Sequence, residues 1–148
     1  MILIAHRGNV SGSSEYENHP DYIEEALKLG YDCEVDVWRK DDEYWLGHDE
    51  PVYDISKSFL QNNKLWCHAK NLEALDMMLN SDIHCFWHQK DDVTLTSKNI
   101  IWTYPKKRLL KGAACVMPEL GYQGKIEECY AICTDYPKLY ALKYNEVQ

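Results

Sequence analysis

The sequence predicts an α/β protein, a compact (β/α) barrel of the TIM type in which several helices are shortened or missing. Seven apolar runs have the length of buried strands, and the first two flank one amphipathic helix. The last four runs begin at residues 83, 99, 113 and 130, which leaves too little chain for a full helix and two loops in each gap. The chain has 148 residues, whereas a typical (β/α)₈ barrel needs roughly 250. We expect one domain over residues 1–148.

The first unit of this fold is a strand, a helix and a parallel strand. Residues 1–5 form an apolar run that leads into a loop rich in Gly, Ser and Asn. Pro20 suits the first turn of a helix over 21–29, and Gly30 suits its end. The apolar run at 33–38 completes a βαβ unit, and such units are almost always right-handed.

The chain then turns back before the pattern resumes. Residues 43–46 form a returning strand that leads to His48, and 51–63 form a loop with a short helical turn. A third parallel strand covers 65–69, and Asn71 caps the helix after it. We expect this helix, at 71–79, to bury a stripe made of Leu72, Leu75, Met78 and Leu79. Four further apolar runs of strand length follow, at 83–87, 99–103, 113–117 and 130–134.

Composition restricts the classes of function. The chain is 45% hydrophobic and 27% charged, with a formal net charge of −8. This charge argues against a nucleic-acid partner, because nucleic-acid-binding domains usually carry a basic face. No run approaches the roughly eighteen apolar residues of a membrane span, and the start lacks the apolar core of a signal peptide. We therefore expect a cytoplasmic protein without a membrane span.

Six cysteines lie singly in or beside apolar segments, without any Cys-x-x-Cys pair. Their spacing differs from that of structural zinc sites, and a disulfide framework is not expected in a protein without a secretory signal. We expect them to be small buried hydrophobic side chains in a reducing compartment.

Two acidic residues share one face of the second predicted strand. Glu34 and Asp36 are two positions apart, so both side chains project to one side, and their apolar neighbours project to the other. Two carboxylates on one face repel each other unless a positive charge lies between them. One interpretation is a half-exposed strand with its polar face in water. The other is a pair of oxygen ligands for a hard cation such as Mg²⁺ or Ca²⁺.

Five short motifs in a fixed order favour the second interpretation. Ala5-His6-Arg7-Gly8 ends the first strand, Glu17-Asn18 precedes the first helix and Glu34-x-Asp36 lies on the second strand. His48-Asp49 follows the returning strand, and Thr134-Asp135-Tyr136-Pro137 lies at the end of the last strand. This pattern resembles the glycerophosphodiester phosphodiesterase family, which belongs to the phosphatidylinositol-phospholipase-C-like barrels. The resemblance is dense over residues 2–51, returns at 130–140 and is thin between.

The resemblance implies metal-dependent hydrolysis of a small glycerophosphodiester-like phosphodiester to an alcohol and a phosphomonoester. It implies that His6 and His48 are the acid–base pair, without fixing which is which; imidazole suits both tasks because it titrates near neutrality. It also implies that Glu34 and Asp36 bind a divalent metal ion, with Glu17 as a further acidic ligand. Mg²⁺ or Ca²⁺ is the expected cofactor.

The third strand departs from the family pattern. The family usually has a Glu-x-Lys there, whereas this chain reads His68-Ala69-Lys70. His68 therefore stands in place of a metal-binding glutamate, and we expect it among the metal ligands. An imidazole in that position removes a negative charge and softens the site. This change favours Mn²⁺ or Zn²⁺, or accompanies a loss of activity.

Two cationic side chains are expected to bind the substrate phosphate. Arg7 offers a planar, permanently charged fork that matches a phosphate group. Lys70, which the third strand retains, would neutralise phosphate charge.

Aromatic residues follow several of the predicted strands. We expect Trp87 and Trp102, together with Tyr104, to flank the organic group of the substrate; core packing is the alternative. His88 and Glu119 also follow apolar runs, and we expect them near the same mouth.

Three functions are compatible with these residues. The leading hypothesis is the phosphodiesterase. A domain that binds phosphodiesters without turnover is the second, and His68 motivates it. A lyase of the phospholipase-C type, which releases a cyclic phosphate, is the third. The thin helical shell also suggests a homodimer.

Overall fold

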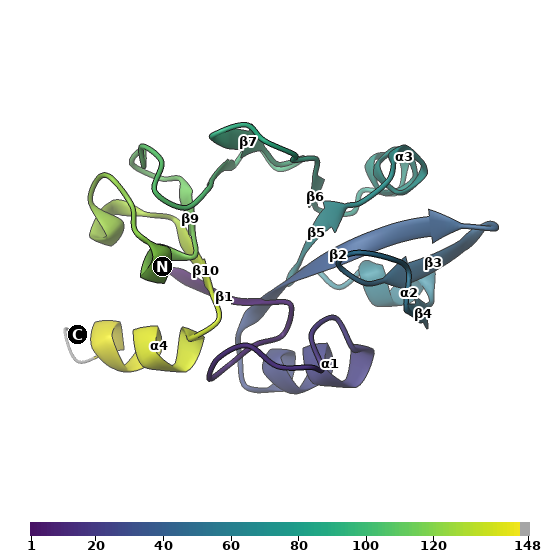
Figure 1. Cartoon of the computed structure of the whole chain (residues 1–148), viewed down its shortest axis with the longest axis horizontal. Coiled ribbons are helices and arrows are strands. Elements are labelled where there is room, and N and C mark those ends of the chain that lie inside the picture. The colour runs from purple at the N-terminus through teal and green to yellow at the C-terminus, as the bar shows by residue number, and fades with distance from the viewer. Residues whose placement is uncertain (146–148) are drawn as a thin grey trace.

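The strands curl around a shared interior in the computed structural model, which describes residues 1–145 (Figure 1). Ten strands form one sheet, and the parallel ones follow the order β6-β5-β2-β1-β10-β9-β8. These parallel strands are β1 (Ile2–His6), β2 (Asp32–Lys40), β5 (Leu65–Ala69), β6 (Cys85–Phe86), β8 (Ile101–Thr103), β9 (Ala114–Val116) and β10 (Ala131–Thr134). The predicted α/β class is confirmed, and each parallel strand coincides with one of the expected apolar runs.

Three further strands run antiparallel to their neighbours. The long β2 continues into a hairpin with β3 (Glu43–Leu46), which pairs in turn with β4 (Tyr53–Ile55). The third is β7 (Val93–Leu95), which pairs with β8. In the described part of the chain β6 and β8 are not paired with each other, so the sheet is a half-barrel. Ser97, between β7 and β8, connects to β6: its backbone N–H donates a 2.8 Å hydrogen bond to the carbonyl oxygen of Cys85.

Helices lie on the outer side of the curled sheet (Figure 1). They are α1 (Pro20–Lys28), α2 (Lys57–Leu60), α3 (Leu72–Asn80) and α4 (Pro137–Asn145), with short 3₁₀ turns η1 (Pro118–Leu120) and η2 (Ile126–Glu128). Pro20 occupies the first turn of α1, and the Asn71 side chain accepts from Ala74 N at the start of α3, as predicted. The helix α4 was not among the predicted elements.

The buried face of α3 differs from the predicted stripe. Met78 is buried and Leu75 packs against the core as predicted, but Ala74 and Met77 complete the buried face, whereas Leu72 and Leu79 are 67% and 54% exposed. Both sets have helical spacing, so periodicity alone does not choose between them. The small Ala74 lets the helix approach β2 and β5 closely, which turns the two leucines toward solvent.

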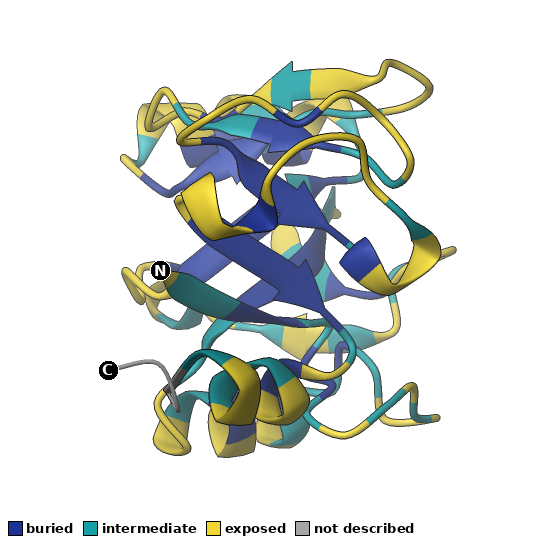
Figure 2. Ribbon diagram, turned by 90° about the vertical axis from the view of Figure 1, so that its left-hand side faces the viewer, coloured by how far each residue is buried: buried dark blue, intermediate teal, exposed yellow. Residues whose placement is uncertain are grey.

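The parallel strands are buried on both faces, as Figure 2 shows by their dark blue ribbons beneath largely exposed helices. Cys33, Val35 and Val37 of β2 pack outward among the residues under α1 and α3. Ile4, Trp66, Phe86 and Trp102 belong to the cluster that fills the interior. All six cysteines are buried and free, as expected. Among residues 1–145, no helix combines the length and apolar character needed to cross a bilayer.

The inward-facing positions change from apolar to polar toward the carboxyl end of the strands. On β1, Ile4 is followed two residues later by His6, and on β5, Trp66 is followed by His68. Because alternate residues share a face, the polar side chains lie one layer above the apolar core. They meet at a single edge of the sheet.

Candidate active site

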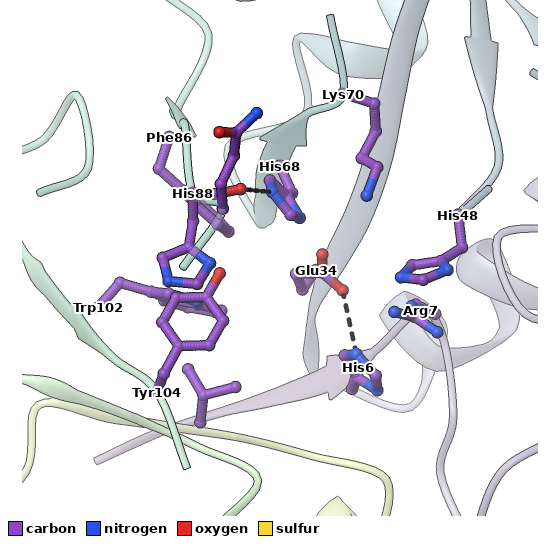
Figure 3. A pocket seen from close by; sticks show the side chains of 12 residues that line it. His6, Arg7, Glu34, His48, His68, Lys70, Phe86, His88, Trp102 and Tyr104 are labelled. Carbon is purple, nitrogen blue, oxygen red and sulfur yellow. Dashed lines mark hydrogen bonds and ion pairs between the residues drawn. The ribbon is translucent and has the colours of Figure 1, made fainter. Parts of the chain in front are cut away.

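A cavity of about 460 Å³ opens at this edge (Figure 3). It is lined by His6, Arg7, Glu34, His48, His68, Lys70, Phe86, His88, Gln89, Trp102, Tyr104 and Val116. The structure therefore brings together both predicted acid–base histidines, both predicted phosphate-binding cations and two of the predicted metal ligands. The other two predicted ligands, Asp36 and Glu17, do not line the cavity.

Glu34, Asp36 and His68 form a cluster that can hold a metal ion, because their ligand atoms lie within 4.8 Å of one another. Both carboxylates are buried, and among the described residues Glu34 Oε2 has no hydrogen-bond partner. Burial raises the pKa of Glu34, and the neighbouring Asp36 charge raises it further. A buried carboxylate oxygen without a partner is costly, and a bound cation would remove that cost.

Asp36 already has several partners. Its Oδ2 lies 3.1 Å from Arg7 Nε and accepts a 2.9 Å hydrogen bond from Asn18 Nδ2, while Oδ1 lies 3.2 Å from His68 Nδ1. Burial by itself would raise the pKa of Asp36, but the adjacent His68 ring and the Arg7 charge lower it to about 2. Asn18 also accepts from the Asp36 backbone N–H, so it fixes both ends of this residue.

The His68 ring is held in one orientation. Its Nε2 donates to the His88 carbonyl oxygen over 3.2 Å, and the ring stacks on Phe86 with centroids 5.0 Å apart. Nδ1 is thereby directed toward the carboxylates. A carbonyl that fixes one ring nitrogen and leaves the other for an ion is the usual arrangement around metal-bound histidines.

His6 forms a pair with a residue from the far end of the chain. Its Nδ1 lies 2.8 Å from Asp135 Oδ1, and Nε2 faces the cavity, 3.9 Å from Glu34 Oε2. Asp135 follows β10, which pairs with β1. Burial would lower the pKa of His6, but the Asp135 hydrogen bond and the Glu34 charge raise it above its ordinary value.

Arg7 adopts a left-handed backbone with φ of 53°, and its backbone N–H donates to Glu34 O over 2.9 Å. This turn directs its guanidinium between two carboxylates, Asp36 and Glu17; Glu17 Oε2 lies 3.1 Å from Arg7 Nη1. The other Glu17 oxygen accepts from Asn9. The structure therefore makes Glu17 a partner of Arg7 and does not bring it into the metal cluster.

His48 and Lys70 approach the cavity from the side of β3 and β5 (Figure 3). The His48 side chain is 46% exposed at the rim, with Nδ1 paired with Asp49 Oδ1 at 2.8 Å. Lys70 Nζ lies 3.9 Å from Asp36 Oδ1. Both residues are therefore in place to contact a ligand that enters from solvent.

The structure brings only one of the two predicted tryptophans to the cavity. Trp102 is 1% exposed and lines the cavity, where Tyr104 and His88 join it. Trp87 packs against the outer cluster of β2, β5 and α3 and is not among the lining residues. Side chains alternate along a strand, so with Phe86 pointing inward, Trp87 points outward. Glu119 also lies outside the lining and accepts from Thr134 Oγ1.

Three polar residues that support the site were not predicted for that role. Asp135 belongs to a recognised motif at the end of the last strand, which was the available signal. Asn9 is fully buried, and its Nδ2 donates to both Glu17 and Asp135 over 2.8 Å. Asn18 belongs to the Glu17-Asn18 motif, and its side chain hydrogen-bonds both the carboxylate and the backbone N–H of Asp36. The last two roles depend on partners distant in sequence.

No family model, curated protein or solved structure matches the chain. What the site can do is inferred from its own chemistry. The acidic cluster can hold a cation, a fixed imidazole can move a proton, and two cationic side chains can attract an anion.

Proposed function

We propose that the chain is a metal-dependent phosphodiesterase, which hydrolyses a small phosphodiester to an alcohol and a phosphomonoester on a trimmed TIM-type barrel. The observation that carries this proposal is the position of His6. Its imidazole is oriented by Asp135 and faces a buried carboxylate cluster in the same cavity as Arg7 and Lys70. The order of the short motifs, which resembles that of the glycerophosphodiester phosphodiesterases, supports it.

Glu34, Asp36 and His68 would hold the divalent ion. The buried Glu34 oxygen without a partner and the ring nitrogen of His68 fit this role. A metal ion bound there would stabilise the negative charge that develops on the phosphoryl oxygens. The mixed nitrogen and oxygen donors suit Mn²⁺ or Zn²⁺ better than an all-carboxylate set would.

The chain's own residues would divide the remaining work. Arg7 and Lys70 attract the phosphate anion, and the salt bridge with Asp36 orients the Arg7 guanidinium. His48, at the solvent-exposed rim, takes a proton from the attacking water as the new P–O bond forms. His6, whose pKa the Asp135 hydrogen bond and the Glu34 charge raise, gives its Nε2 proton to the alcohol oxygen as the other P–O bond breaks.

The test is hydrolysis of bis(p-nitrophenyl) phosphate and of a panel of glycerophosphodiesters, with Mg²⁺, Ca²⁺, Mn²⁺, Zn²⁺ or EDTA. We expect turnover that EDTA abolishes and that His6→Ala and His48→Ala each reduce strongly. His19→Asn is the matched control, since His19 lies outside the cavity and asparagine can also cap α1. Turnover that persists in EDTA or in His6→Ala would contradict the proposal.

One observation favours a second function, phosphodiester binding without turnover. The Arg7 guanidinium already lies 3.1 Å from Asp36 Oδ2, so part of the negative charge of the cluster is balanced without a cation. Tight binding of a phosphodiester with no product under any metal would establish this alternative. A cyclic phosphate product would instead indicate the lyase.

A further inference from the structure

One wall of the cavity is made of rings. Phe86 lies between His68, with centroids 5.0 Å apart, and Trp102, with centroids 4.7 Å apart. Tyr104 stacks on His88 with an angle of 15° between the ring planes. Phe86 and Trp102 are 2% and 1% exposed, so their neighbours fix their positions. Figure 3 shows Tyr104 and His88 in front of Trp102, on the side of the cavity opposite His48 and Arg7.

The opposite wall carries the cationic groups. Arg7, Lys70 and His48 approach from that side, so the phosphate of a bound diester is expected there. An ester group attached to this phosphate would then extend toward the rings. Aromatic faces bind flat groups by stacking, whereas a short, flexible polyol has no flat face to offer.

The charges of the residues that line the cavity affect which ester groups can bind next to the rings. Aromatic faces also attract cations, but Glu34 is the single carboxylate among the lining residues, against Arg7 and Lys70. A bound metal ion would add further positive charge. The carboxylates that act on Tyr104 are Glu34 and Asp36, and a bound metal ion would neutralise them. This wall therefore carries no charge that selects a charged ester group, and an uncharged ring is favoured.

We propose that Tyr104 and the rings behind it select phosphodiesters in which one ester group is a planar, uncharged ring. The proposal rests on the phosphodiester function proposed above and assigns Tyr104 as the residue that determines specificity. Tyr104 is half-buried and faces the cavity, so its ring is available to a ligand as those of Phe86 and Trp102 are not.

The test measures binding apart from turnover. Dissociation constants of methyl phenyl phosphate, dimethyl phosphate and glycerophosphocholine are measured by calorimetry on the full chain in EDTA. The first two ligands carry the same charge and differ in the ring. We expect methyl phenyl phosphate to bind about three- to tenfold more tightly than dimethyl phosphate, the range for one aromatic stacking contact.

Three variants locate the effect. Tyr104→Leu should abolish the preference, and Tyr104→Phe should retain it, because the ring and not the hydroxyl makes the contact. Tyr122→Leu, at an exposed tyrosine outside the cavity lining, should also retain it. Equal affinity for the two matched diesters, a preference that survives in Tyr104→Leu, or tighter binding of glycerophosphocholine would overturn the proposal.

Hydrolysis assays on the same protein separate this proposal from the proposed function. Turnover without a preference for ring-bearing diesters would contradict the selective role of Tyr104 and leave the proposed hydrolysis standing. A preference for ring-bearing diesters without turnover would contradict the proposed phosphodiesterase activity and support the selective role of Tyr104. Absence of binding to all three diesters in EDTA would contradict the role of Tyr104, and absence of turnover with every metal would contradict the proposed hydrolysis.

Discussion

His6 Nδ1 lies 2.8 Å from Asp135 Oδ1, although 129 positions separate these residues along the chain. Pairing of β1 with β10 brings the two strand ends together. With Nδ1 bound to the carboxylate, Nε2 is the ring nitrogen that faces the cavity.

Asp135→Asn should reduce turnover about ten- to a hundredfold, by analogy with the loss of a partner that orients a metal-binding histidine. The variant should also change the pH dependence. The Asp135 carboxylate helps to raise the pKa of His6, and the proposed acid must be protonated. Loss of the Asp135 carboxylate should therefore lower the pKa of His6 and move the high-pH decline of kcat to lower pH. An unchanged profile in a protein with normal circular dichroism would contradict the role of Asp135.

Asn9→Ala should lower the free energy of unfolding by roughly 2–4 kcal/mol, because buried polar groups would lose their partners. Asn9 donates to Glu17 and Asp135 and accepts from the Tyr22 hydroxyl. Urea denaturation measures the loss. Asn80→Ala is the matched control, since Asn80 is exposed at the end of α3 and should change stability by less than about 0.5 kcal/mol. Equal effects would show that the Asn9 network does not stabilise the fold.

Stability should fall in acid because of Asp36. Its pKa in the folded chain is about 2, against an ordinary value of 3.8. Its stabilising contribution is therefore complete above pH 3.8 and is lost as the pH falls through 2. The contribution is about 2 kcal/mol from this difference. Urea denaturation of the wild type and Asp36→Asn between pH 6 and pH 2 measures it, and their stability difference should narrow toward pH 2. A stability difference between wild type and Asp36→Asn that does not change with pH would contradict the lowered pKa of Asp36.

His68→Glu should change the metal preference. A carboxylate in place of the imidazole hardens the donor set, so affinity for Mg²⁺ or Ca²⁺ should rise relative to Zn²⁺. Calorimetric titration of each ion compares the variant with the wild type. His88→Gln, which alters a lining residue outside the acidic cluster, should leave the order of affinities unchanged. The same order in His68→Glu as in the wild type would show that His68 is not a ligand.

Local patterns in the sequence predict much of this protein. Alternation along β2 separates Glu34 and Asp36 from the apolar residues between them, and the strand ends place the other candidate residues near them. Pro20 in the first turn of α1 and the Asn71 cap of α3 mark two helix starts correctly. These features depend on residues that are close together in the sequence, so they can be predicted without knowledge of the tertiary structure.

Features that depend on contacts between distant segments were predicted less well. The sequence predicts Glu17 as a metal ligand, but its carboxylate forms a salt bridge with Arg7, whose left-handed backbone directs the guanidinium toward it. Trp87 was expected at the cavity, yet in a strand as short as β6 a shift of one position decides which side chain points inward. The roles of Asn9 and Asn18 required knowledge of which strands are neighbours.

The pairing of the first and last parallel strands has a consequence for synthesis. His6 leaves the ribosome early, and the residue that orients it is added more than a hundred positions later. Until β10 docks beside β1, the imidazole lacks its Asp135 partner. A growing chain, or one whose translation stalls before residue 135, would therefore lack the carboxylate that orients the proposed proton donor. Chemistry at this site would begin only with the completed sheet.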